Sequence, residues 1–270
     1  MDKRIRQPAV AGLFYPGDPD ELVRTVDAFL QAGRGAASPV APGFVPKALI
    51  VPHAGYIYSG SVAARAYVLL DGVTSIRRVL LLGPAHRVPV RGLAHPDCDA
   101  FLTPLGEVPI DRSGLAELAD LPQVTASAHA HALEHSLEVQ LPFLQRQLGG
   151  FALLPLIVGD AEIEDVAEVI ERFRTDSETL IVISSDLSHY HGYEQARGID
   201  AATAAEILAL HPPLSHEQAC GATPVNGLLM VASRHALKVR QLDLRNSGDT
   251  FGDRGGVVGY GAFAFDGADR

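Results

Sequence analysis

The chain repeatedly sets a short apolar run between two longer segments that have the periodicity of amphipathic helices. Six such runs, rich in leucine and β-branched residues, read as strands at 47–51, 77–82, 151–158, 179–184, 238–244 and 258–265. The helical segments are 19–32, 60–70, 134–148, 161–174, 193–210 and 224–236. Continuous apolar strands are typical of parallel sheets covered on both faces. We therefore expect an α/β fold with a mostly parallel or mixed central sheet flanked by helices.

The connections between these segments contain no boundary between domains. Residues 88–112 hold several prolines and glycines and read as an irregular or hairpin insert. Residues 33–46 and 245–257 read as surface loops. Because no segment has the composition of a clear linker, we expect residues 1–270 to form a single domain.

Composition narrows the classes of partner and compartment. The formal charge is −10 and no basic patch is evident, which argues against nucleic acid or an anionic membrane as a partner. No run of 18 apolar residues is present, and the N-terminus lacks the apolar core of a signal peptide. Two cysteines cannot form a disulfide framework. We expect a cytoplasmic protein whose partner is a small molecule of unknown identity.

Three of the predicted strands are each followed by a histidine. The runs 47–51, 77–82 and 179–184 lead to His53, His86 and His189. In open α/β sheets the carboxyl ends of the strands line the ligand crevice, so these side chains should converge although they lie far apart in the sequence. Histidine is the commonest metal ligand and titrates near neutral pH. The strand ends therefore predict a metal site.

The residue pattern leaves the third ligand open. Beside His53 and His86, the candidates are His189, Asp186, a carboxylate elsewhere, or Cys220. Thr223 reads as a helix N-cap and Pro224 as the first helical residue. A thiol just before a helix N-terminus can have a lowered pKa, and the thiolate is the form that binds metals.

Further histidines lie in the segment 129–144. His135 is four residues from His131 and three from Glu138, so a continuous helix would place all three on one face. If that face packs at the crevice, His135 and Glu138 can support the ligands or relay protons.

The same residues also admit structural interpretations. A lone histidine at a strand end more often makes a structural hydrogen bond than binds a metal. Asp186 is suited to capping a turn, and Cys220 to packing as a small buried side chain. The sequence contains no phosphate-binding loop, no G-x-G-x-x-G after a strand and no G-x-S-x-G elbow.

Several ordered motifs resemble those of the Memo family, whose bacterial and archaeal members are called AmmeMemoRadiSam system protein B. They are AVAGLFYPGDPDEL (9–22), VPHAGYIYSG (51–60), LLGPAHRVP (81–89), TPLG (103–106), HSLEVQLPFL (135–144), SSDLSHY (184–190) and CGATPVNGLL (220–229). The resemblance runs from about residue 6 to the C-terminus, so it covers nearly the whole chain.

The resemblance implies a fold similar to that of the class III extradiol dioxygenases, which are non-haem iron enzymes. It implies metal ligands at His53, His86 and Cys220. The family pocket also holds the residues that match Asp186, His189 and His135. A thiol stands where the dioxygenases have a carboxylate, and such a His₂Cys set accepts copper as well as Fe(II), with zinc as a further possibility.

Three functions follow from this resemblance. The first is a metal-dependent oxidoreductase of dioxygenase-like chemistry, with His189, steered by Asp186, as acid or base and His135 lining the pocket. The second is a non-catalytic metal-binding protein that serves a radical-SAM protein and an AMMECR1-type protein. The third is a zinc hydrolase, which we rank below the other two.

Overall fold

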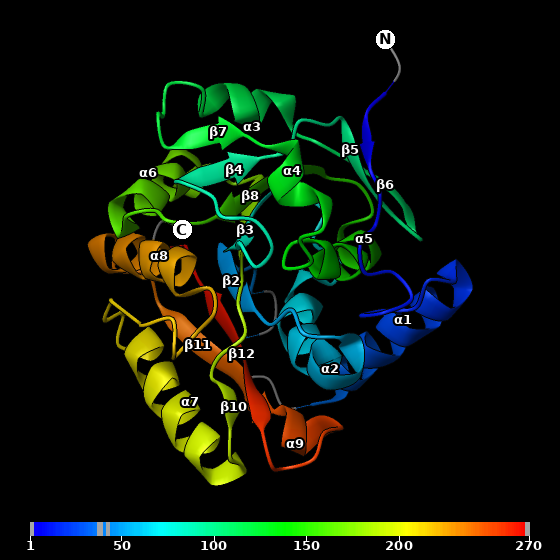
Figure 1. Ribbon diagram of the computed structural model, residues 1–270, viewed down its shortest axis with the longest axis vertical. Coiled ribbons are helices and arrows are strands. Elements are labelled where there is room, and N and C mark those ends of the chain that lie inside the picture. The colour runs from blue at the N-terminus through cyan, green and yellow to red at the C-terminus, as the bar shows by residue number, and fades with distance from the viewer. Residues whose placement is uncertain (1–2, 37–39, 42–43, 268–270) are drawn as a thin grey trace.

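The computed structural model describes residues 3–36, 40–41 and 44–267. A mixed sheet runs through the middle of the molecule in Figure 1, and within the described residues it has nine strands. Their order is β10-β12-β2-β9-β3-β8-β4-β7, with β11 paired to β12. The strands are β2 (Ala48–Val51), β3 (Arg78–Pro84), β4 (Leu93–His95), β7 (Val124–Ala126), β8 (Ala152–Val158), β9 (Thr179–Ser184), β10 (His189–His191), β11 (Val239–Asn246) and β12 (Val257–Phe265).

The centre of the sheet is parallel. Strand β9 lies between β2 and β3 and is parallel to both, with Val51 opposite Ser184 and Leu82 opposite Ile183. Antiparallel pairing is confined to the flanks, where β12 joins β2 and β4 joins β8. The predicted α/β class with a mixed sheet is therefore confirmed, and the three strands that carry the predicted histidines are neighbours.

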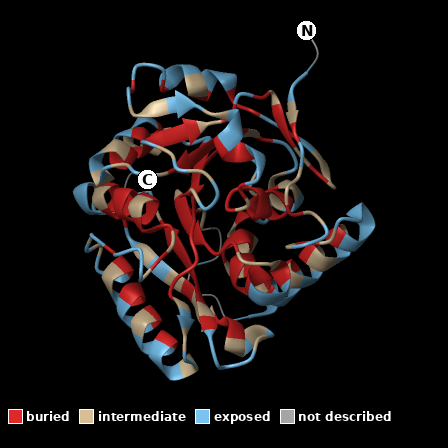
Figure 2. Cartoon of the chain, viewed as in Figure 1, coloured by how far each residue is buried: buried red, intermediate tan, exposed pale blue. Residues whose placement is uncertain are grey.

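Alternation along each central strand divides the core into two layers. In β2, Leu49 and Val51 face one layer while Ala48 and Ile50 face the other. A shift of register by one residue would turn every side chain of a strand to the opposite layer. Because each fully buried aliphatic side chain contributes roughly 1.5–3 kcal/mol, burial on both faces fixes the register strongly. Figure 2 shows the resulting band of buried residues through the sheet and the inner faces of the helices.

Helices cover both faces of this sheet. One layer packs against α1 (Pro19–Gly35), α2 (Tyr56–Tyr67) and α5 (Leu141–Leu148), and the other against α6 (Ile163–Arg174), α7 (Tyr193–Leu208) and α8 (Ala222–Arg234). The shorter helices are α3 (Arg112–Glu117), α4 (Ala128–Ala132), α9 (Ser247–Thr250), η1 (Val68–Leu70) and η2 (Glu138–Gln140). None of the helices in the described ranges is long and apolar enough to cross a membrane.

A small second sheet holds the N-terminal segment. Strand β1 (Ile5–Arg6) pairs in parallel with β5 (Ala100–Thr103), which forms an antiparallel hairpin with β6 (Gly106–Pro109). The hairpin expected within 88–112 is thus present. The predicted loop 33–46 begins later than expected, since α1 continues to Gly35, and its residues 37–39 and 42–43 lie outside the described part.

The continuous helix predicted over 134–148 is wrong. The chain forms α4, leaves the helical path around His135, and resumes as η2 and α5. The Glu134 carboxylate accepts the backbone N–H groups of His135 and Ser136, which competes with helical hydrogen bonding. Pro142 then occupies the first turn of α5, a position where its missing N–H is tolerated.

Candidate metal centre

A cavity of about 750 Å³ opens at the edge of the sheet where β2, β9 and β3 end. All six residues predicted from the sequence and the resemblance line it, together with side chains from several other loops. The lining residues are Phe14, His53, His86, Arg87, His135, Asp186, His189, Tyr190, His191, His216, Glu217 and Cys220. The convergence expected from the strand ends is therefore present in the structure.

Three histidines form the tightest group in this cavity. One ring nitrogen each from His53, His86 and His135 lie within 4.8 Å of one another. The ring of His86 stacks on that of His135 at a centroid distance of 4.7 Å, and the His53 ring stands nearly perpendicular to both. Such a cluster of imidazole nitrogens can hold a metal ion.

The ring of His53 is locked in one tautomer. The hydroxyl of Ser184 donates to the carbonyl of Ser136 at 2.6 Å, so its oxygen must accept from His53 Nδ1, which lies 2.9 Å away. Nδ1 therefore carries the proton, and Nε2 presents its lone pair to the cavity. Burial, followed by the neighbouring His86 and His135, lowers the pKa of His53 well below its usual value, which keeps the ring neutral.

The ring of His86 is oriented by Glu134. One carboxylate oxygen accepts the backbone N–H of His86 at 2.6 Å, and the other lies 2.9 Å from His86 Nδ1. Burial would raise the pKa of Glu134, but the hydrogen bond from the His86 ring and the backbone N–H groups of Ser136 and His86 hold it well below its usual range. An ionised Glu134 requires a donor at Nδ1, which leaves His86 Nε2 for a ligand.

The third ring, His135, has an unpaired nitrogen. Its Nδ1 is buried and forms no hydrogen bond with the described residues, although it lies 3.4 Å from Glu134 Oε1. The ring of Phe14 packs against it at 4.8 Å. Burial lowers the pKa of His135 to about 4, so the ring is neutral at pH 7. One nitrogen of this neutral ring lies within 4.8 Å of a ring nitrogen of both His53 and His86, so His135 can serve as a third imidazole ligand.

Cys220 lies next to this group. Its Sγ is 3.3 Å from His53 Nε2 and accepts the backbone N–H of Asp186 at 3.3 Å. Gly221 lets the chain after Cys220 pack closely against Ser185, because a Cβ at this position would come within 2.7 Å of the Ser185 side chain. The expected lowering of the thiol pKa is wrong: burial and the Asp186 carboxylate raise the pKa of Cys220 to about 12. The expected cap is wrong too, since α8 begins at Ala222 with Gly221 as its N-cap.

Asp186 and His189 both follow the end of β9, but their side chains have different hydrogen-bond partners. The Asp186 carboxylate accepts the backbone N–H of His53 at 2.7 Å and thereby joins the ends of β2 and β9. Burial raises the pKa of Asp186 to about 6. The ring of His189 is oriented by the carbonyl of Leu187, 2.8 Å from Nδ1, rather than by Asp186 as expected.

Two residues of the 129–144 cluster lie outside the cavity. His131 is buried with Nε2 2.8 Å from the carbonyl of Ala94. Glu138 is fully buried and forms an ion pair with Arg6. The expected shared face of His131, His135 and Glu138 does not exist, because the helix that would create it is interrupted.

Comparison with known proteins identifies the family of this chain. Residues 6–264 match the family model described as Memo-like protein. The chain belongs to the Memo family. It is 38% identical to a MEMO1 family protein of Aquifex aeolicus, over 95% of this chain and 97% of that one. A MEMO1 family protein of Ignicoccus hospitalis is 34% identical, over 97% of this chain and 98% of that one.

A solved structure shares the fold of this Memo family chain. The uncharacterized protein JW3007 from Escherichia coli K12 aligns with a TM-score of 0.54 at 14% sequence identity. The alignment covers 82% of this chain and all of that one. This likeness supports the α/β architecture described above.

Sequence reasoning missed the residues that orient the histidines. Glu134 is one of them, and the only local signal was an acidic residue directly before His135. Ser184 and Gln140 are others: Gln140 Nε2 donates to Ser184 Oγ at 2.8 Å, and Ser184 in turn fixes His53. These partners are 44 or more positions apart in the sequence, so no spacing rule identifies them.

Proposed function

We propose that this Memo family protein binds a redox-active metal, iron or copper, in the cavity at the carboxyl ends of β2, β9 and β3, and acts on a small molecule there. The supporting observation is the cluster of His53, His86 and His135, whose ring nitrogens lie within 4.8 Å of one another. Fixed tautomers at His53 and His86 support the same conclusion, because they direct unprotonated nitrogens into the cavity.

His53 and His86 are the proposed ligands in either version of the site. The resemblance stated above suggests Cys220 as the third, and its sulfur lies 3.3 Å from His53 Nε2. His135 is the alternative third ligand, favoured by the distance of at most 4.8 Å that separates one of its ring nitrogens from those of His53 and His86. Two imidazoles with a thiolate favour soft metals such as copper and also accept iron or zinc, whereas three imidazoles suit iron, copper and zinc.

When bound, the metal would supply redox chemistry, and this chain's own residues would manage protons beside it. His189 lines the cavity with Nδ1 bonded to the Leu187 carbonyl, so Nε2 is the nitrogen that can accept or donate a proton. We propose His189 as the acid or base. Asp186 and His135 complete the proposed set, Asp186 with a pKa raised to about 6 by burial.

A non-catalytic role is the second candidate. The thiol of Cys220 stands where the class III extradiol dioxygenases have a carboxylate, and its high pKa leaves it protonated at neutral pH. Such a site can bind metal without running oxygen chemistry, in the service of a radical-SAM or AMMECR1-type partner.

Oxygen uptake by metal-loaded protein separates the two candidates. Wild type loaded anaerobically with Fe(II) or Cu(I) should consume O₂ with a catechol, thiol or other reductant, and His189→Gln should bind metal normally but turn over more slowly by about 10²–10⁴-fold. Protein that retains its metal but consumes no O₂ with any of these reductants would favour the non-catalytic role.

A further inference from the structure

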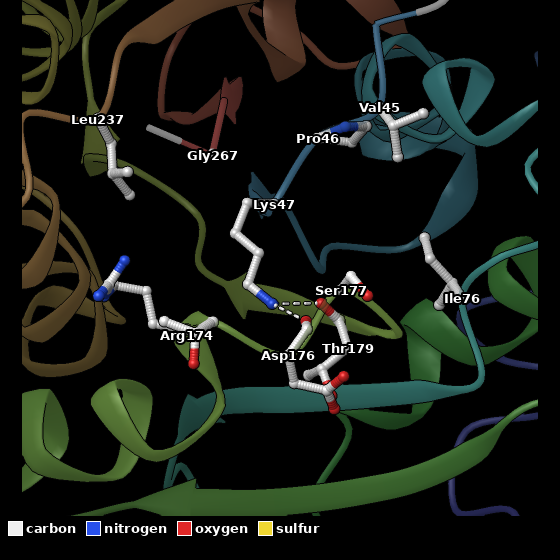
Figure 3. A pocket seen from close by; sticks show the side chains of 11 residues that line it. Val45, Pro46, Lys47, Ile76, Arg174, Asp176, Ser177, Thr179, Leu237 and Gly267 are labelled. Carbon is white, nitrogen blue, oxygen red and sulfur yellow. Dashed lines mark hydrogen bonds between the residues drawn. The ribbon is translucent and has the colours of Figure 1, made fainter. Parts of the chain in front are cut away.

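A second cavity lies at the opposite edge of the central sheet, where β2 and β9 begin. It has a volume of about 160 Å³ and is shown in Figure 3. Its residues come from the segments before β2 and β3, the turn between α6 and β9, and the chain before β11 and after β12. They are Val45, Pro46, Lys47, Ile76, Arg174, Thr175, Asp176, Ser177, Thr179, Leu237 and Gly267.

Lys47 reaches across this cavity. Its Nζ donates to the backbone carbonyls of Asp176 at 2.6 Å and Thr179 at 2.7 Å, as the dashed lines in Figure 3 mark. A lysine ammonium has three N–H donors, so these two carbonyls leave one donor for another acceptor. Within the described residues, no ion pair joins Lys47 to a carboxylate, because the side chain of Asp176 is engaged by Arg78 and Thr179.

The charge on Lys47 is therefore poorly compensated. Burial is the main cause that lowers its pKa to about 8, and the positive charges of Arg174 and Arg78 act in the same direction, against Asp176. An anion at the third donor of Lys47 would stabilise the charged form of this buried amine.

The walls of the cavity restrict the kind of anion. Val45, Ile76 and Leu237 present aliphatic side chains, and Figure 3 shows Lys47 between Leu237 and Ile76. A compact, strongly hydrated anion such as phosphate gains nothing from this aliphatic part of the wall. A carboxylate with a short alkyl chain satisfies both the ammonium and the apolar surface.

We propose that this cavity binds a small monocarboxylate, whose carboxylate accepts the third N–H of Lys47 and whose short alkyl chain packs against Ile76 and Leu237. The simpler alternative is that Lys47 only caps the carbonyls of the turn after α6. The two interpretations differ in whether an added carboxylate changes the environment of Nζ.

The chain is suited to a direct test because it contains three lysines. Protein labelled with ¹³C-lysine gives three side-chain signals, and Lys3 and Lys238, both exposed, serve as controls within one sample. We would titrate the ¹³Cε signals with pH, with and without propionate. Propionate should raise the pKa of Lys47 by about one unit and leave Lys3 and Lys238 unmoved.

Chain length and charge provide the second comparison. Butyrate and propionate should bind to wild type more tightly than formate, by about three- to tenfold, and inorganic phosphate more weakly than propionate. A Lys47 signal that moves no more than that of Lys238 would refute the site, and equal responses to phosphate and propionate would refute the monocarboxylate; both readouts need only wild-type protein.

Discussion

Two buried glutamates four residues apart, Glu134 and Glu138, are alike in burial and in the number of hydrogen bonds that they accept. Each accepts four hydrogen bonds from described residues, and each is almost completely excluded from solvent. Their partners differ. Glu134 binds the ring and backbone of His86 and the turn at His135, whereas Glu138 binds Arg6 and the segment that follows it. Burial and the number of hydrogen bonds therefore do not separate the two carboxylates; the identity of their partners does.

Both glutamates affect the surroundings of His135. Glu138 accepts the backbone N–H groups of Ala9 and Val10 and the hydroxyl of Tyr15, which fastens the N-terminal segment to the core. That segment carries Phe14, whose ring packs on His135 in the cavity. We interpret Glu138 as a structural anchor whose effect on the cavity is indirect, and Glu134 as the group that directs the imidazoles.

The largest effect should come from removing the anchor. Glu138→Ala leaves the buried guanidinium of Arg6 without its charge partner and strands two backbone N–H groups, so we expect a loss of ~3–5 kcal/mol in the free energy of unfolding. Urea unfolding measures it. Asp27→Asn, which breaks the exposed pair with Arg146, is the control and should change stability little. Equal losses in the two variants would contradict the assignment.

The matching test of Glu134 is the substitution Glu134→Gln. Loss of the charge that orients His86 should reduce metal affinity by about 10–100-fold, with a smaller effect on stability than Glu138→Ala. Competition with a chelator of known affinity gives the dissociation constants. A Glu134→Gln variant that binds metal like wild type but unfolds as easily as Glu138→Ala would reverse the roles we assign.

Proton release on metal binding distinguishes Cys220 from His135 as the third ligand. A Cys220 thiol with a pKa raised to about 12 must lose its proton to bind, so metal binding at pH 7 should release about one proton and affinity should rise about tenfold per pH unit. Calorimetry in buffers of different ionisation enthalpy measures this. We expect the release in wild type and none in Cys220→Ser. No release in wild type, with metal lost in His135→Ala, would assign the third position to His135.

The smallest effect is the pH dependence of stability without metal. His135 has a pKa of about 4 when folded and an ordinary value of 6.5, so the unfolded chain binds more protons between these values and stability falls as pH drops through that window. Asp186, with a pKa raised to about 6, acts in the opposite direction. Urea midpoints should decline less with acid in His135→Gln and more in Asp186→Asn; the reverse order would contradict the burial of either group.

Much of the fold could be predicted because it depends on local apolar patterns. The run 179–184 is β9 to the residue, and the run 77–82 differs from β3 by one or two positions at its ends. The general rule for α/β sheets then placed His53, His86 and His189 at one edge. The order of the strands was not predictable, since it is decided by long-range pairing.

The details of the site escaped sequence reasoning for a physical reason. The helix over 134–148 failed because the side chain of Glu134 bonds its own turn and a ring 48 residues away. The pKa of Cys220 was predicted in the wrong direction because burial and Asp186 outweigh any effect of the nearby helix N-terminus. Both errors arise from contacts between distant segments, which residue spacing does not encode.

The central claim is that the ends of β2 and β3 build a metal site, and metal content tests it most directly. Wild type, His53→Ala, His86→Ala and the control Lys238→Met would be purified anaerobically, checked for folding by thermal melts, and analysed for iron, copper and zinc. Our account predicts about one metal ion per chain in wild type and Lys238→Met, and almost none in the two histidine variants. Wild type that stays empty after anaerobic reconstitution, or histidine variants that keep a full complement of metal, would contradict it.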